Sequence, residues 1–315
     1  MIKTPRIQPQ TASVSALEAE TNAESVAPEK ALHSELPVVV YSPESPLANP
    51  GKLIGEVFGD LWRCRELVWI LFQRDLKAQF RQSYLGYVWL FLPPVMTTLV
   101  WLFLNSQRVI SVGETGIPYP VFVIVGSVVW QTFVKLLQSP LAAFNAGKPV
   151  FMKLKVPPEA FIAAGTARAV FEFAIYSIVL IPVFAVFQIL PPWTVLLVPV
   201  AVLALFTIGT ALGLMLVPFG SLYTDIQQAI PIVMGFLMYM APVVYPPPES
   251  GLASVAIRYN PLTPILMSTR DFLTTGSLEY LPQILLIIAV TLPIIFLATI
   301  VIRIVMPHLI ARMGM

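Results

Sequence analysis

The sequence predicts an all-α integral membrane protein with six transmembrane helices, an N-terminal amphipathic interfacial helix and an outer re-entrant region. Of its 315 residues, 57% are hydrophobic and only 11% are charged, whereas about a quarter of a globular protein is charged. Six apolar runs follow one another along the chain, most of them close to the roughly 20 residues that cross a bilayer as a helix. Basic residues gather between alternate runs, which predicts that both termini are cytosolic.

Composition divides the chain into three parts. Residues 1–50 are rich in Ala, Ser, Glu, Pro and Gln; such a segment cannot bury enough apolar surface to fold alone, so we expect a disordered cytosolic tail. Residues 51–82 are expected to form the interfacial helix, and residues 83–315 the six-span domain. The helix expected over 51–82 has two faces, because apolar and basic positions separate at helical spacing. They are Phe72, Leu76 and Phe80 on one side and Arg74, Lys77 and Arg81 on the other.

The first apolar run, Tyr84–Leu104, contains no charged residue and carries Pro93 and Pro94 in its middle. Prolines inside a transmembrane helix leave backbone groups that neighbouring helices or water must satisfy. We therefore expect this span to be kinked and packed inward against other helices.

Five further runs complete the predicted set of spans. A connection at 138–159, which carries three lysines between prolines, is expected to be a cytosolic loop. The run that ends at Val244 is short, and Gly209 and Gly213 in the run before it predict a close helix–helix approach. The runs are Ile117–Leu137, Phe161–Phe187, Trp193–Val217, Ala229–Val244 and Leu281–Val305.

Two features in the second half of the chain are unusual for a simple bundle. Arg168 and Glu172 lie four residues apart in an apolar run and are expected to form an intramembrane pair. The apolar segment Pro261–Leu273 is too short to span, so Asn260 and Pro261 are expected to begin a re-entrant half-helix. A plain extracellular loop with one surface helix is the alternative.

Several functions lack the residues that they need. The two histidines offer no metal cluster, Cys64 has no partner for a disulfide within the chain, and the net charge of +2 gives no support for nucleic-acid binding. No phosphate-binding loop is present, so we expect no ATP hydrolysis by this chain, and we expect no catalytic residues. An ion-driven transporter would have only Glu172 as its ion site, and Arg168 neutralises it. A membrane-bound glycosyl- or acyltransferase and a structural scaffold are further alternatives.

The clearest signal is a short motif at the start of the first span. It reads Arg74-Asp75-Leu76-Lys77, then Tyr84-Leu85-Gly86-Tyr87-Val88-Trp89, then the two prolines. This motif resembles the opening of the polysaccharide branch of the type-2 ABC export permeases, and the resemblance extends over roughly 67–312. These permeases move lipid-linked O-antigens, capsules and teichoic acids. The resemblance implies a permease subunit of an ATP-driven exporter in the inner membrane that moves a lipid-linked polysaccharide. An ABC exporter of another lipid or amphiphile is the alternative.

The resemblance also implies partners and places for them. It implies a homodimer in contact with membrane lipids and with two copies of a separate ATPase, which holds the ATP and Mg, while this chain binds no cofactor. Contacts with the ATPase are expected at Arg74, Asp75, Lys148, Lys153, Lys155 and Asp225. Because sugar rings stack on aromatic side chains, a substrate path is expected along Tyr84, Tyr87, Trp89, Phe236 and Tyr239. The alternative for these rings is packing or anchoring at the headgroup level, as expected for Trp193.

Overall fold

The computed structural model describes residues 59, 62–110, 112–151, 156–248 and 250–313. The predicted tail at 1–50 and two of the predicted ATPase contacts, Lys153 and Lys155, lie outside these residues. Helices and no strands are found in the described part of the chain, which confirms the all-α prediction.

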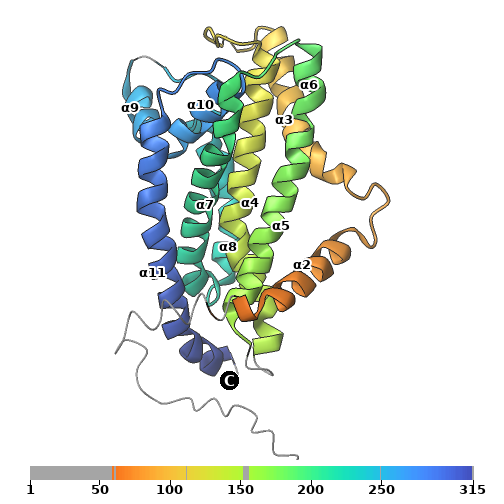
Figure 1. Cartoon of the computed structure of the whole chain (residues 1–315), viewed down its shortest axis with the longest axis vertical. Helices are drawn as coiled ribbons and strands as arrows, with labels where there is room; N and C mark the ends of the chain where they lie inside the picture. Colours follow the sequence, from red (N-terminus) through yellow and green to blue (C-terminus); the bar gives the residue numbers. More distant parts are fainter. Residues whose placement is uncertain (1–58, 60–61, 111, 152–155, 249, 314–315) are drawn as a thin grey trace, which may run out of the picture. The chain divides into compact units, whose positions relative to one another are not determined.

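The helices follow the predicted runs closely, with additional short helices between them (Figure 1). In chain order they are α2 (Arg65–Phe80), α3 (Val88–Ser106), α4 (Tyr119–Phe151), α5 (Pro158–Ile178), α6 (Leu180–Val186), the 3₁₀ helix η2 (Trp193–Leu197), α7 (Val198–Gly220), α8 (Thr224–Leu237), the 3₁₀ helix η3 (Met238–Met240), α9 (Leu252–Tyr259), α10 (Leu262–Leu273) and α11 (Leu281–Met313).

Five helical stretches among the described residues are long and apolar enough to cross a membrane, namely 88–106, 119–151, 158–186, 193–220 and 281–305. These spans make the chain a multi-pass membrane protein. The predicted fifth run corresponds to α8 and η3, which have 14 and 3 residues. It is shorter than the other five, as its sequence indicated.

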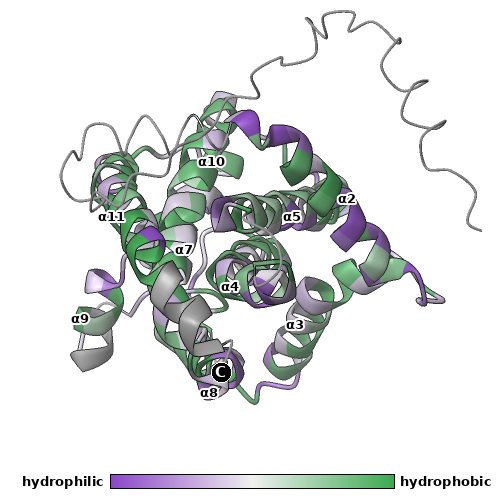
Figure 2. Ribbon diagram, turned by 90° about the horizontal axis from the view of Figure 1, so that it is seen from below, coloured by the Kyte–Doolittle hydropathy of each residue, from purple (hydrophilic) through white to green (hydrophobic). Residues whose placement is uncertain are grey.

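Helix α4 is the centre of the bundle, with α3, α5, α7 and α8 arranged around it (Figure 2). Every residue from Phe122 to Trp130 is buried. Helix α3 differs from the prediction that it packs inward, because Leu99, Val100 and Phe103 are exposed along it. Its apolar residues meet the membrane or another chain, and an apolar run alone does not distinguish these surroundings from a protein core.

The predicted loop conformation at 138–159 is largely wrong, because α4 continues as a helix to Phe151 through Pro140 and Pro149. Its cytosolic location stays a prediction. Packing explains the difference. Phe144 and Phe151 are buried, with ring centroids 5.5 Å apart, and Phe151 also contacts Phe161 of α5. These contacts hold the helix together beyond the points where two prolines remove backbone donors.

The close approach predicted at Gly209 and Gly213 is confirmed. A Cβ atom added to Gly209 would lie 2.6 Å from Cβ of Leu136, and one added to Gly213 would lie 2.6 Å from the carbonyl oxygen of Leu137. Both neighbours belong to α4. The two glycines therefore let α7 pack directly on the backbone of the central helix.

Candidate functional site

The five aromatic residues of the predicted substrate path are all exposed, but they form two groups. Tyr84, Tyr87 and Trp89 lie at the start of α3, whereas Phe236 and Tyr239 lie at the far end of α8 and in η3. Tyr239 contacts α3 at Trp101, twelve residues after Trp89, so the two groups are separated by about 18 Å along α3 at 1.5 Å per residue. The structure therefore does not bring the five rings together as one site.

A shared surface nevertheless connects the two groups. Helices α3 and α8 both flank α4 (Figure 2), and the rings of Trp101 and Tyr239 approach each other with centroids 6.2 Å apart. Both helices expose large apolar side chains. We call this the α3–α8 surface; its exposed residues are Trp89, Leu92, Met96, Leu99, Val100 and Phe103 of α3 and Ile232, Val233, Phe236, Tyr239 and Met240 of α8 and η3.

Tyr87 has a different environment from its neighbours in the motif. Its ring lies 4.4 Å from the ring of Phe80 and 6.2 Å from that of Phe171, measured between centroids. Tyr87 thus packs α2 and α5 against the start of α3. Tyr84 is fully exposed, and Trp89 makes no ring contact with the described residues.

The four described residues among the predicted ATPase contacts belong to α2, to the C-terminal part of α4 and to the first turn of α8. These segments lie at the end of the bundle where the C-terminal part of α11 is found (Figure 1). Arg74 and Asp75 form an ion pair with each other, 2.8 Å long, on the exposed side of α2. The Lys148 ammonium donates a 2.7 Å hydrogen bond to the carbonyl of Ser221, at the C-terminus of α7, where a positive charge is favourable. Asp225 is exposed in the first turn of α8.

Helix α4 is tied to α8 at this same end. The side-chain amide of Asn145 donates to the side-chain oxygen of Gln227 at 2.9 Å. Together with the bond from Lys148 to Ser221, it connects the C-terminal parts of α4 and α7 with the start of α8. A force applied near Asp225 would therefore act on the central helix as well as on α8.

A charged cluster lies within the membrane-spanning part of the bundle. Arg168 Nε and Glu172 Oε1 are 3.3 Å apart, so the expected pair is present. The same carboxylate also pairs with Lys135 Nζ of α4 at 3.3 Å, and the Tyr176 hydroxyl lies 3.5 Å from it. Sequence reasoning missed Lys135, although a single lysine in an apolar run of α4 was a signal that could have been read.

A second residue that the sequence analysis did not single out is Arg270. Its side chain is only 2% exposed, inside α10, and its guanidinium stacks 3.6 Å from the ring centroid of Phe122. Nε donates to the carbonyl of Phe122, and the two terminal nitrogens donate to those of Pro242 and Val243, over distances of 2.6–3.1 Å. Burial lowers the pKa of Arg270 to about 9, so it remains charged at neutral pH.

The buried segment after η3 depends on these donors, because it is not helical. In this segment, residues 241–244, side chains satisfy three of the four backbone carbonyls, and the fourth accepts an internal bond; a further side-chain donor reaches Met240, the last residue of η3. The Asn260 amide donates to Met240, Arg270 to Pro242 and Val243, and the Tyr119 hydroxyl to Val244, while Ala241 accepts from the amide of Val243.

Asn260 has a second bond, because its side-chain oxygen accepts from the amide of Leu262 at the start of α10. Pro261, the other residue expected to begin a half-helix, immediately precedes α10. Most of α10 is buried, including Ile265, Leu266 and Phe272, so the alternative of a surface helix at 261–273 is wrong.

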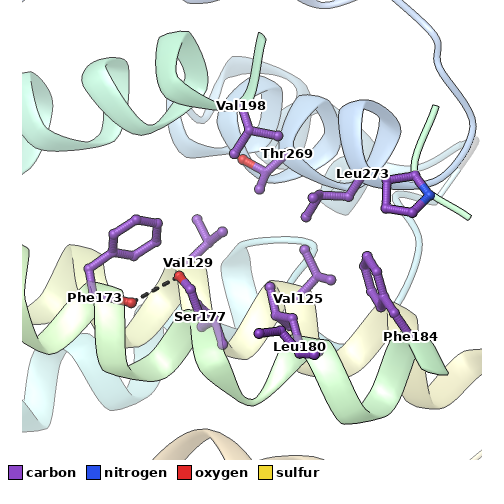
Figure 3. A pocket seen from close by; sticks show the side chains of 12 residues that line it. Val125, Val129, Phe173, Ser177, Leu180, Phe184, Val198, Thr269 and Leu273 are labelled. Atoms are coloured by element: carbon purple, nitrogen blue, oxygen red, sulfur yellow. Dashed lines mark hydrogen bonds between the residues drawn. The ribbon is translucent and has the colours of Figure 1, made fainter. Parts of the chain in front are cut away.

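A cavity of about 260 Å³ lies between α4, α5, α6, α7 and α10 (Figure 3). Its lining is almost entirely apolar. The two hydroxyls in it bond to their own helices, Ser177 to the carbonyl of Phe173 and Thr269 to that of Ile265. The cavity therefore offers hydrocarbon contact and no polar groups for a sugar or a reacting substrate. The described residues also contain no group of three potential metal ligands.

Comparison with known proteins gives a consistent result. Residues 66–274 match the family described as ABC-2 type transporter. The O-antigen export system permease protein RfbA of Myxococcus xanthus is 24% identical over 76% of this chain and 92% of its own length. A protein with the same description from Klebsiella pneumoniae is 24% identical over 68% of this chain and 83% of its length.

A third relative carries a different name. The polysialic acid transport protein KpsM of Escherichia coli is 22% identical over 69% of this chain and 87% of its length. The family match covers more than half of the chain and includes all helices from α3 to α10. With its multi-pass helical bundle, this chain belongs to the ABC-2 type transporter family as a membrane-embedded permease.

Proposed function

We propose that this chain is the membrane subunit of an exporter that moves a lipid-linked polysaccharide from the cytosol across the inner membrane. The observation that carries the proposal is the extended match to proteins named for O-antigen export and polysialic acid transport. The α3–α8 surface supports it, because its exposed rings suit weak, repeated stacking on sugars. Such contacts let a polymer move, whereas one tight site would stall it.

ATP hydrolysis belongs to a separate chain in this proposal. The sequence has no phosphate-binding loop, so ATP and Mg bind to a partner ATPase, and two copies serve a permease homodimer. The surface around Arg74, Asp75 and Asp225 receives that partner. The bonds of Lys148 and Asn145 then transmit its movement to α4, α7 and α8.

A homodimer follows from the apolar character of the α3–α8 surface. One copy leaves this surface open, and two copies facing each other would enclose a path between them. In this proposal α2 and both termini lie on the cytosolic side and α9 and α10 lie outside, which the bases on α2 support. In this arrangement α2 lies in the membrane interface and α10 re-enters the bundle from the outer side.

Deleting the gene in its native host tests the export function. Surface polysaccharide should fall to background, and lipid-linked polymer should accumulate in the inner membrane. Expression of the wild-type chain should restore both. Normal surface polysaccharide in the deletion strain would refute the proposal, and accumulation of a different lipid would indicate an exporter of another amphiphile.

Topology needs its own test. On a Cys64→Ser background, a cysteine introduced at the exposed Ser250 should react with a membrane-impermeant maleimide added from outside. A cysteine at the exposed Lys77 should react only after the membrane is opened. The reverse pattern would refute the orientation.

A further inference from the structure

The charged cluster of Lys135, Arg168 and Glu172 carries more positive than negative charge. Both cations pair with one carboxylate, each over 3.3 Å, and no other carboxylate in the described part of the chain pairs with either. Glu172 is 1% exposed, whereas the side chains of Lys135 and Arg168 are 36% and 37% exposed. The negative group is thus enclosed, and the two cations face outward around it.

A surplus charge at this position needs an explanation, because an uncompensated cation inside a membrane is expensive. Neutralising Glu172 would require one cation. The second cation therefore suggests an additional anion that is not part of the described chain. Residues that merely stabilise the fold would be expected to balance their charges or to be fully enclosed, as Arg270 is by three carbonyls.

The neighbouring helices place the cluster near the level of α2. Phe171, next to Glu172 in α5, lies with its ring centroid 6.1 Å from that of Phe72 in α2. Arg74 and Lys77 are exposed on α2, so this helix carries its bases at the same level. A basic helix of this kind lies among lipid headgroups. The two cations of the cluster are then within reach of headgroup phosphates.

The cluster also lies beside the inner end of α3. Tyr176, whose hydroxyl approaches Glu172, packs in a small buried group with Leu90 of α3 and Val128 of α4. Lys135 lies two turns after Val128 on the same face of α4. The cluster therefore lies next to α2 and the start of α3, which are joined by residues 81–87 (Figure 1).

We propose that Lys135 and Arg168 bind the phosphate of an anionic lipid that enters between α2 and the inner end of α3. Lysine and arginine both donate charge-assisted hydrogen bonds to phosphate oxygens, and arginine offers a planar pair of donors. Glu172 holds the two side chains in position from behind. For a phospholipid of the bilayer the proposal does not depend on the exported cargo, whereas for a lipid carrier it rests on the proposed function.

The bound phosphate can belong to either of two kinds of lipid, and Lys135 and Arg168 would form the same charge-assisted hydrogen bonds with both. It belongs either to a phospholipid of the bilayer or to the polyprenyl phosphate that carries a growing polysaccharide. Native mass spectrometry of the full chain in detergent, titrated with phosphatidylglycerol and separately with a polyprenyl phosphate, distinguishes them. Equal affinities indicate a bilayer lipid, and stronger binding of the polyprenyl phosphate indicates the carrier; both results support the site.

Single substitutions test the site without leaving a buried charge unpaired. Lys135→Gln and Arg168→Gln each leave one cation on Glu172, so the cluster becomes neutral and remains compatible with folding. Each should weaken binding of the favoured lipid about tenfold, the effect of losing one charge-assisted hydrogen bond. Arg258→Gln, which removes an exposed cation of α9 at the other end of the bundle, should leave the affinity unchanged.

A change in the opposite direction gives an independent measurement. Glu172→Gln keeps both cations and removes the competing carboxylate, so lipid binding should become several-fold tighter. Lys135→Arg keeps the positive charge and should retain lipid binding. This variant provides the test of position 135 if Lys135→Gln does not fold. Wild-type affinity in Lys135→Gln, Arg168→Gln and Glu172→Gln would overturn the proposal, as would binding of inorganic phosphate without binding of either lipid.

Discussion

Helices α3 and α4 look alike as sequence and differ completely in their surroundings. Each is a long apolar run interrupted by prolines. Yet α4 is enclosed by other helices over most of its length, whereas α3 presents much of its apolar surface outward. The comparison shows that an apolar sequence indicates a helix surface shielded from water. It does not indicate whether lipid, another helix or another chain covers that surface.

The difference has a basis in side-chain size. The outer half of α4 contains Gly126 and Ser127 among β-branched residues, which lets neighbouring backbone and side chains approach closely. Helix α3 instead exposes Met96, Leu99 and Phe103, large flexible or aromatic side chains that suit lipid or a second copy of the chain. Substitutions in the two helices should accordingly affect different properties, stability for α4 and association or transport for α3.

The largest expected effect concerns the arginine that holds the outer half of α4. Arg270→Met would leave the carbonyls of Pro242 and Val243 without their donor, at about 1 kcal/mol or more each, and would remove a second bond from the Phe122 carbonyl, which lies inside helix α4, so the loss should reach at least about 2 kcal/mol. Thermal unfolding of the purified protein measures it. Arg258→Met, which removes an exposed arginine of α9, is the matched control and should leave the melting temperature nearly unchanged. Equal melting temperatures for the two variants would show that Arg270 does not stabilise this region.

A smaller loss is expected from Gly126→Ala, because the added methyl group would collide with the Arg270 guanidinium and the carbonyl of Val243. Overpacking of this kind costs about 1–3 kcal/mol. Gly235→Ala in α8 is the control, since nothing lies within 4 Å of its added Cβ and alanine favours a helix over glycine. Thermal unfolding should show a loss for the first and none for the second. A reduced export activity in Gly235→Ala with unchanged stability would indicate that a partner chain covers α8.

Phe103→Ala should leave the unfolding of a single copy unchanged and weaken its association. Phe103 and Phe219 are 62% and 61% exposed, but only Phe103 belongs to the α3–α8 surface. Cross-linking of the protein in proteoliposomes should therefore show a smaller dimer fraction for Phe103→Ala than for Phe219→Ala. Equal dimer fractions would contradict a dimer interface on α3 at this position.

Much of the fold could be predicted from the sequence, because apolar runs of sufficient length determine where helices cross a membrane. The helix after Leu137 was not predicted, since prolines at 140 and 149 suggest a break and the aromatic packing that outweighs them is tertiary. Single-sequence patterns likewise could not place α4 at the centre, which depends on how the other helices surround it.

The candidate site was predicted in part, for related reasons. Arg168 and Glu172 could be paired from their spacing on one helix, but Lys135 reaches them from another helix. Arg270 looked like an ordinary outer base, because its partners are backbone carbonyls that leave no signature in sequence. An ion pair within one helix can be predicted from the spacing of its residues in the sequence. A charged residue whose partners lie on other helices can be recognised only in the structure.

The smallest expected effect concerns the aromatic rings at the start of α3, and the structure separates two of them. Tyr87 packs against Phe80 and Phe171, so Tyr87→Ala should reduce both stability and export. Trp89 is exposed and makes no ring contact with the described residues, so Trp89→Ala should reduce export while leaving the melting temperature unchanged. By analogy with aromatic pairs, loss of one stacking ring is worth about 0.5–1.5 kcal/mol, a two- to tenfold effect on export.

The amount of surface polysaccharide, measured in cells at equal protein levels, checks the predicted loss of export. Trp193→Ala, which removes another exposed tryptophan, is the control. Normal export in Trp89→Ala would mean that this ring anchors α3 at the headgroups. The Phe103→Ala cross-linking experiment would then be the remaining test of whether α3 faces lipid or a second copy of the chain.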